Sequence, residues 1–156
     1  MDARKRLMMQ VALIAIVVIG LAIDAWVHFD LASAFKNNKT STLNEAELFR
    51  AEAVGAIVAA LALAIRPRRW TAALAFIVAG GGTALVVLYR YVNVGSFGPI
   101  PNMYDPFWGP AGKTLSVWGE AIAALAALGL FVMFHAQVRR STSESAAPER
   151  TAQLSR

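Results

Sequence analysis

The sequence predicts an all-α, polytopic membrane protein, an antiparallel bundle of four transmembrane helices. Three observations predict this fold: a high apolar content, four long apolar segments, and basic residues at the ends of those segments. Of the 156 residues, 57% are hydrophobic and 16% are charged, whereas a soluble domain has about 45–50% apolar and about 25% charged residues. The apolar excess indicates a chain that contacts the lipid bilayer.

Four apolar segments approach or exceed the roughly 20 residues that a spanning helix needs. They cover approximately residues 7–28, 49–66, 70–92 and 115–138. The second is short, but Thr42-Leu43-Asn44-Glu45 precedes it and fits a capping box, with Thr42 as the N-cap and Glu45 reaching back. A helix over residues 43–66 would be about 36 Å long at about 1.5 Å per residue, which is enough to cross a bilayer.

Basic residues predict the orientation of the chain. The clusters Arg4-Lys5-Arg6, Arg66-Pro67-Arg68-Arg69 and Arg139-Arg140 fall on one side of the predicted membrane, and the positive-inside rule makes that side cytoplasmic. Both termini are then cytoplasmic. The first apolar segment is too long for a signal peptide and lacks a cleavage site after it, so we expect an uncleaved span. The expected location is the inner cell membrane, with multiple passes.

The chain divides into a membrane domain, residues 1–140, and a polar tail, residues 141–156. The tail, "STSESAAPERTAQLSR", has no aromatic residue and is predicted to be disordered. The outer loop, residues 93–114, contains four prolines, four glycines and four aromatic residues. Because proline and glycine fix turns and aromatic rings need a surface to pack on, we expect an ordered loop. A floppy loop with one or two interfacial aromatics is the alternative.

Composition also excludes several kinds of chemistry. The chain has no cysteine, which excludes disulfide exchange, thiolate catalysis and cysteine-ligated metal or iron–sulfur sites. The net charge is +5, but most basic residues flank apolar segments, so we expect no nucleic-acid partner. No catalytic motif is recognisable, which argues against an enzyme without excluding one, and no catalytic residue is assigned.

Ionisable residues lie in the outer third of every predicted span. Asp24 and His28 are one helical turn apart in the first. Glu52 enters the second span, Arg90 ends the third, and Glu120 follows the start of the fourth. A charge inside a bilayer costs several kcal/mol unless it is paired, so such residues usually face the bundle interior or water. The pattern predicts a polar vestibule that opens outward and is walled by these five residues.

The predicted vestibule has several possible roles. Three carboxylates and one histidine could bind a divalent metal or relay protons. With Tyr89, Tyr91 and Trp118 nearby, the same residues could hold a small polar ligand or a quinone head group. No single cofactor or metal follows from the sequence.

A purely structural interpretation competes with these roles. In it, Arg90 pairs with Asp24 or Glu120 and locks the packing of the helices. Gly80-Gly81-Gly82 in the third span favours close helix approach, although the same run could thin a wall beside a ligand. A conducting channel ranks third, because no polar stripe reaches the inner face.

The segment "AEAVGAIVAALALAIRPRRWTAALAFIVAG", residues 51–80, resembles DoxX-like four-helix membrane proteins. In that family a glutamate followed by small residues opens the second span and an arginine marks the turn into the third; Glu52, Gly55 and Arg66 match these positions. The first span departs from the family pattern, since His28-Phe29-Asp30 stands where the family has His-Gly and a basic residue. The outer loop also resembles that of small four-span bacterial membrane proteins. The DoxX-like resemblance implies a membrane subunit associated with a redox complex or a quinone.

Two functions are therefore predicted. In the first, the protein is an accessory or structural subunit of a membrane complex, with another membrane protein or a second copy of the chain as its partner. In the second, it is a DoxX-like redox-associated protein that binds a quinone, a metal or a small molecule in the vestibule.

Overall fold

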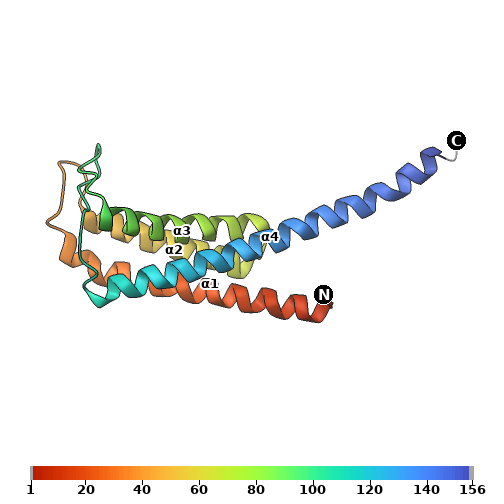
Figure 1. Ribbon diagram of the computed structural model, residues 1–156, viewed down its shortest axis with the longest axis horizontal. Coiled ribbons are helices and arrows are strands. Elements are labelled where there is room, and N and C mark those ends of the chain that lie inside the picture. The colour runs from red at the N-terminus through yellow and green to blue at the C-terminus, as the bar shows by residue number, and fades with distance from the viewer. Residues whose placement is uncertain (1, 155–156) are drawn as a thin grey trace.

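The computed structural model describes the backbone of residues 2–154 and the side chains of residues 2–139. The described chain is all-helical. Its elements are α1 (Ala3–Ala32), the short 3-10 helix η1 (Ser33–Phe35), α2 (Glu45–Ile65), α3 (Arg69–Tyr91) and α4 (Ala111–Leu154). The two longer loops lie together at one end of the helices, which we call the loop end, and the N-terminus and the short α2–α3 turn lie toward the other (Figure 1).

Four helical segments are long and apolar enough to cross a membrane, which confirms this part of the predicted fold. They are Ala3–Phe35, Glu45–Ile65, Arg69–Tyr91 and Ala111–Arg139. The observed helices extend beyond the predicted apolar segments at several ends, because a helix continues into polar residues that can leave the hydrocarbon layer.

The last part of α4 covers most of the tail that the sequence predicts to be disordered. The backbone is helical through Leu154, and in Figure 1 α4 continues as a single helix well past the other three. Residues 141–154 include three alanines and two glutamates, which are good helix formers. Residues 155–156 of the predicted tail lie outside the described residues.

The predicted N-cap of α2 was wrong: Asn44, and not Thr42, caps this helix. The side chain of Asn44 accepts a hydrogen bond from the Glu47 N–H at 2.9 Å, and the Glu47 carboxylate accepts one from the Asn44 N–H at 2.9 Å. This is a complete capping box. Glu45 is therefore not used as a capping residue, and its carboxylate instead accepts a hydrogen bond from Asn38.

The helices pack through small side chains. Alanines recur at helical spacing on the buried face of each later helix: Ala53, Ala56 and Ala59 on α2, Ala72, Ala75 and Ala79 on α3, and Ala123, Ala126 and Ala127 on α4. Such residues let helix backbones approach closely. Large apolar side chains such as Leu125 and Trp70 are instead 72% and 68% exposed, an arrangement suited to lipid contact.

The crossing of α1 and α4 is especially close. A Cβ atom added to Gly20 would lie 2.6 Å from the carbonyl oxygen of Gly119 and 2.8 Å from the Cβ of Ala123. No side chain fits in this space, so glycine is required at position 20. The crossing lies one turn before Asp24 on α1 and one residue before Glu120 on α4, and it therefore sets how closely these two acids approach.

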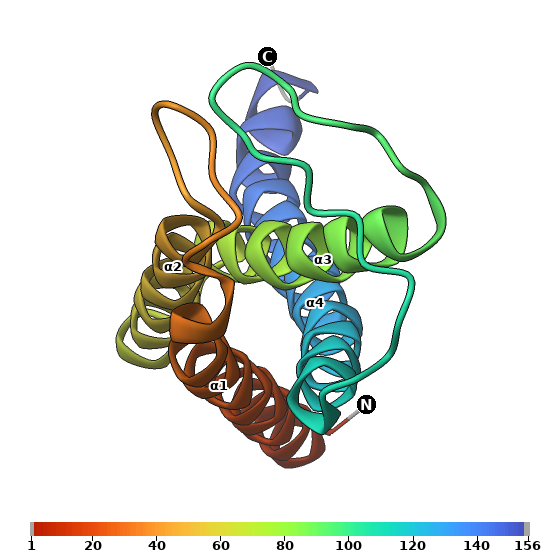
Figure 2. The same cartoon turned by 90° about the vertical axis from the view of Figure 1, so that its left-hand side faces the viewer.

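The loop between α3 and α4, residues 92–110, is tied to the loop between η1 and α2. The Asn38 amide donates to the carbonyl oxygen of Asn102 at 2.8 Å, and the Thr40 hydroxyl donates to that of Pro99 at 2.8 Å. Viewed from the loop end, this segment runs across the front of the molecule from α3 to α4 (Figure 2).

The same loop is also fixed to the two helices that it connects. The Asp105 N–H donates to the carbonyl oxygen of Tyr89, the last turn of α3, at 3.2 Å. The Lys113 ammonium group, in the first turn of α4, lies 2.8 Å from Asp105 Oδ2 and 3.0 Å from the carbonyl oxygen of Phe107. These contacts hold the loop over the ends of the helices.

Substituting Gly20 with alanine should destabilise the protein, because the new methyl group must displace the α4 backbone. Overpacking of this kind costs about 1–3 kcal/mol. Gly81→Ala is the matched control, since nothing lies within 4 Å of a Cβ at that position. Thermal unfolding of the detergent-solubilised variants, followed by circular dichroism, measures the difference. Equal melting temperatures for the two variants would contradict the close crossing.

Candidate functional site

A cavity of about 410 Å³ lies at the loop end, within the range of roughly 300–1,000 Å³ that is typical of small-molecule sites. We call it the loop-end cavity. Its wall is mostly apolar and comes from all four helices and the loop 92–110. The apolar lining residues are Val27, Leu31, Phe35, Leu48, Phe49, Ala51, Gly82, Leu85, Val86, Tyr89, Ile100, Met103 and Pro110.

Polar residues line this cavity at two levels. Glu45, Asp105 and Lys113 lie near the loops, where each already has a partner. A second set of polar residues lines the cavity further from the loops: His28, Glu52 and Ser116. Glu52 and Ser116 lie about two turns and one turn after the starts of α2 and α4, and His28 lies one turn before the end of α1. We call this second level the inner end of the cavity.

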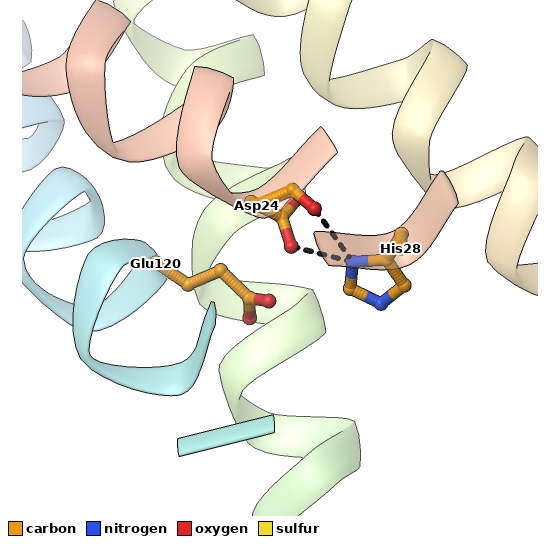
Figure 3. Close-up of side chains that lie close together, drawn as sticks. All are labelled: Asp24, His28 and Glu120. Atoms are coloured by element: carbon orange, nitrogen blue, oxygen red, sulfur yellow. Dashed lines mark hydrogen bonds and ion pairs between the residues drawn. The ribbon is translucent and has the colours of Figure 1, made fainter. Parts of the chain in front are cut away.

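Four side chains form a hydrogen-bonded group at the inner end: Asp24, His28, Ser116 and Glu120, called the polar cluster below. The Ser116 hydroxyl lies 2.7 Å from Asp24 Oδ1 and 2.8 Å from Glu120 Oε1. Asp24 and Glu120 are fully buried, and Ser116 is 3% exposed. Figure 3 shows the carboxyl groups of Asp24 on α1 and Glu120 on α4 pointing toward one another, with the His28 ring beside Asp24.

The Ser116 contacts constrain the protons in this cluster. A serine hydroxyl has a single proton, so it can donate to only one of the two carboxyl groups. The second carboxyl group also lies within hydrogen-bond distance of the Ser116 oxygen. This contact is a hydrogen bond only if the second carboxyl group is protonated and donates to Ser116. With no ion bound, the two acids are therefore joined through Ser116 by a shared proton.

The His28 ring is held by Asp24 on one side and Phe49 on another. His28 Nδ1 lies 2.7 Å from Asp24 Oδ1 and 3.1 Å from the Asp24 carbonyl oxygen. A carbonyl oxygen can only accept, so Nδ1 carries the proton in this arrangement. The Phe49 ring packs edge-on against the imidazole, with centroids 5.2 Å apart. Nε2 is thereby the ring nitrogen left for a molecule in the cavity.

Three carboxylate oxygens near the cluster are buried without a partner. They belong to three residues: Asp24 (Oδ2), Glu52 (Oε1) and Glu120 (Oε2). Gly82 on α3 makes room for two of them, since a Cβ there would lie 2.6 Å from Glu120 Oε2 and 3.2 Å from Glu52 Oε1. Leaving a buried polar atom without a partner costs about 1–3 kcal/mol, and more for a charged group. A proton on the carboxyl group or a polar species bound beside it would remove this cost.

Five of the eight predicted site residues lie at this site. Asp24, His28 and Glu120 share the polar cluster, and one donor atom from each lies within 4.8 Å of the others. Glu52 and Tyr89 line the cavity.

Three predicted site residues, Arg90, Tyr91 and Trp118, do not line the cavity. The expected pairing of Arg90 with Asp24 or Glu120 was wrong, since its guanidinium group lies 5.0 Å from the Tyr91 ring centroid and 5.5 Å from that of Trp108. Tyr91 and Trp118 are 66% and 65% exposed. These residues have the predicted depth along their helices but lie on other faces.

Sequence reasoning missed Ser116 and Gly82. Ser116 is four residues before Glu120 and therefore on the same helix face, a signal that could have joined it to the predicted vestibule. Gly82 was assigned to helix packing with its two neighbours. Its contact with Glu120 depends on the rotation of α3, which no local pattern gives.

No protein-family model, curated protein or solved structure matches the chain. The DoxX-like resemblance of residues 51–80 therefore stays a prediction.

Replacing Ser116 with alanine should lower the free energy of unfolding by about 1–3 kcal/mol, because both buried carboxyl groups lose their hydroxyl partner. Thr83→Val is the control, since the Thr83 hydroxyl only donates to the Ala79 carbonyl oxygen of its own helix at 2.9 Å. Chemical unfolding in mild detergent compares the two variants. A loss for Ser116→Ala no greater than that for Thr83→Val would show that the link between the acids contributes little.

Proposed function

We propose that this protein is a multi-pass membrane protein that binds a small amphiphilic molecule in the loop-end cavity. The observation that carries the proposal is the make-up of the cavity wall: apolar over most of its surface and polar at the inner end, at His28, Glu52 and Ser116. Ligand sites typically combine such apolar walls with a few convergent polar groups.

The wall also indicates the chemistry of the ligand. Phe35, Phe49 and Tyr89 line the cavity and suit a flat ring, because aromatic side chains pack well against other ring systems. His28 Nε2 and the Glu52 carboxyl group can exchange hydrogen bonds with hydroxyl or carbonyl oxygens on that ring. A quinone or quinol head group has this chemistry, which supports the predicted redox-associated role of a DoxX-like protein.

We also propose the membrane topology that the sequence predicts. The bundle is antiparallel, both termini are cytoplasmic, and the protein resides in the inner membrane of its cell. The distribution of basic residues supports this orientation, since Arg66, Arg68 and Arg69 lie in and beside the turn between α2 and α3, at the end of the bundle away from the cavity. The cavity then opens to the outer side.

An accessory role in a membrane complex is the second candidate, with another membrane protein or a second copy of the chain as partner. One observation favours it. Large apolar side chains such as Leu125 and Trp70 are exposed on the outside of the bundle, a surface on which another membrane helix can pack. Ligand binding and an accessory role are compatible.

Filling the cavity should abolish ligand binding. Val86 lines the cavity, whereas its neighbour Val87 does not and is 40% exposed. We expect Val86→Phe to lose a co-purifying small molecule in native mass spectrometry and to bind decylubiquinone at least about tenfold more weakly, which corresponds to about 1.4 kcal/mol.

Val87→Phe adds the same side chain on the same helix and should bind like the wild type. Equal binding by the two phenylalanine variants, or no saturable decylubiquinone binding together with no co-purifying molecule in the wild type, would overturn the proposed function.

The proposed orientation predicts which loops are accessible from outside the cell. The chain has no cysteine, so single cysteines at Ser96 and Arg68, both exposed, report on the two ends. A membrane-impermeant maleimide should label Ser96→Cys in intact cells and Arg68→Cys only after permeabilisation. The reverse pattern would invert the topology.

A further inference from the structure

The polar cluster contains two buried acids, and its one possible protein cation, His28, can balance the charge of only one of them. Asp24 and Glu120 are both fully buried and face each other across the α1–α4 interface (Figure 3). Within the side chains that the structure describes, the ion pair of Asp24 is with His28, and no lysine or arginine pairs with either acid. Because buried charges in a membrane helix must be paired, the two acids need protons or a bound cation.

The free oxygen atoms of the cluster favour a cation. Hydrogen bonds within the cluster use Asp24 Oδ1 and Glu120 Oε1. The second oxygen of each acid, Asp24 Oδ2 and Glu120 Oε2, is buried and has no partner. One proton shared through Ser116 satisfies the first pair of oxygens, and the second pair needs a further proton or a cation held between the two acids. A metal ion bound by both carboxylates would satisfy these oxygens.

We propose that the polar cluster binds one divalent metal ion through Asp24, His28 and Glu120, an inference that is independent of the proposed cavity ligand. One donor atom from each residue lies within 4.8 Å of the others. Oxygen and nitrogen ligands lie about 2.0–2.2 Å from a zinc ion, so two ligands of one ion are at most about 4.4 Å apart. Small rotations of the side chains bring the three donors to this range.

The donor types define the class of metal. Two carboxylates and one imidazole, in a chain without cysteine, suit ions that accept oxygen and nitrogen ligands, such as Zn²⁺ or Mn²⁺, and not ions that require thiolates. A divalent ion also balances the two carboxylate charges in full. Binding of the ion would release the proton shared through Ser116 to solvent and move the imidazole proton of His28 from Nδ1 to Nε2, so that Nδ1 can bind the ion.

The cluster is accessible, and its coordination is open on one side. His28 and Ser116 line the cavity, so an ion can enter from the loop end. Three protein ligands leave the fourth position of a tetrahedral ion for water or another ligand. The Glu52 carboxyl group approaches Gly82 on the same side as Glu120 Oε2 and is the nearest further acid that lines the cavity.

Titration with Co²⁺ tests the site. The full-length protein in mild detergent is stripped with EDTA, titrated with Co²⁺ and followed by visible absorption, and bound metal is counted by elemental analysis. We expect one Co²⁺ per chain, displaced by Zn²⁺. The isosteric variants Asp24→Asn and Glu120→Gln should each weaken Co²⁺ binding by more than about a hundredfold, a larger effect than the roughly 10–100-fold loss seen when a group that only supports a ligand is removed.

Asp30→Asn is the matched control, because Asp30 is an exposed acid on the same helix as Asp24 and should not affect binding. Circular dichroism and gel filtration establish that each variant is folded. The chain has only two histidines, so X-ray absorption of the Co²⁺ complex of His135→Gln should still show one imidazole ligand. This measurement does not depend on the acid variants.

Three outcomes would overturn the metal site. They are the absence of saturable Co²⁺ binding by the wild type, unchanged binding by folded Asp24→Asn and Glu120→Gln, and the absence of an imidazole ligand in the His135→Gln complex. The first would assign the cluster to shared protons. None of them bears on the decylubiquinone experiment, so the metal site and the cavity ligand can fail separately.

Discussion

The close crossing of α1 and α4 at Gly20 is the constraint on which the rest of the site depends. Because position 20 has no room for a Cβ beside the Gly119 carbonyl oxygen, the two helices approach closely just before Asp24 and Glu120. The approach brings two acids from distant parts of the sequence to either side of one serine hydroxyl. A wider crossing would separate them, and neither the shared proton nor a common ligand would be possible.

Gly82 has the corresponding role on α3. The space left by its missing side chain is occupied by the carboxyl groups of Glu120 and Glu52, so α3 closes over the polar cluster without displacing it. Alanine packing holds the bundle together elsewhere, and large apolar side chains lie on the outside. The two fully buried acids thus lie beside the cavity, where the packing of small residues leaves room for their carboxyl groups.

The sequence places the site residues at similar positions along their helices, but it does not show which face of each helix they occupy. The length and hydropathy of the apolar segments locate the spans. The four-residue spacing of Asp24 and His28 places both residues on one face of α1, because this follows from the helical repeat. The rotation of each helix about its axis does not follow, since a lipid-facing helix is apolar all round and carries no polar stripe to mark its outer face. Arg90 and Trp118 therefore had the right depth but the wrong face.

His28 joins the two parts of the site. Its Nδ1 is held by Asp24 in the polar cluster, while the residue also lines the cavity. Any change of charge in the cluster, by a proton or by a metal ion, therefore acts on the ring that a molecule in the cavity would meet. The charge held by Asp24 and Glu120 therefore influences whether that ring donates or accepts a hydrogen bond toward the cavity.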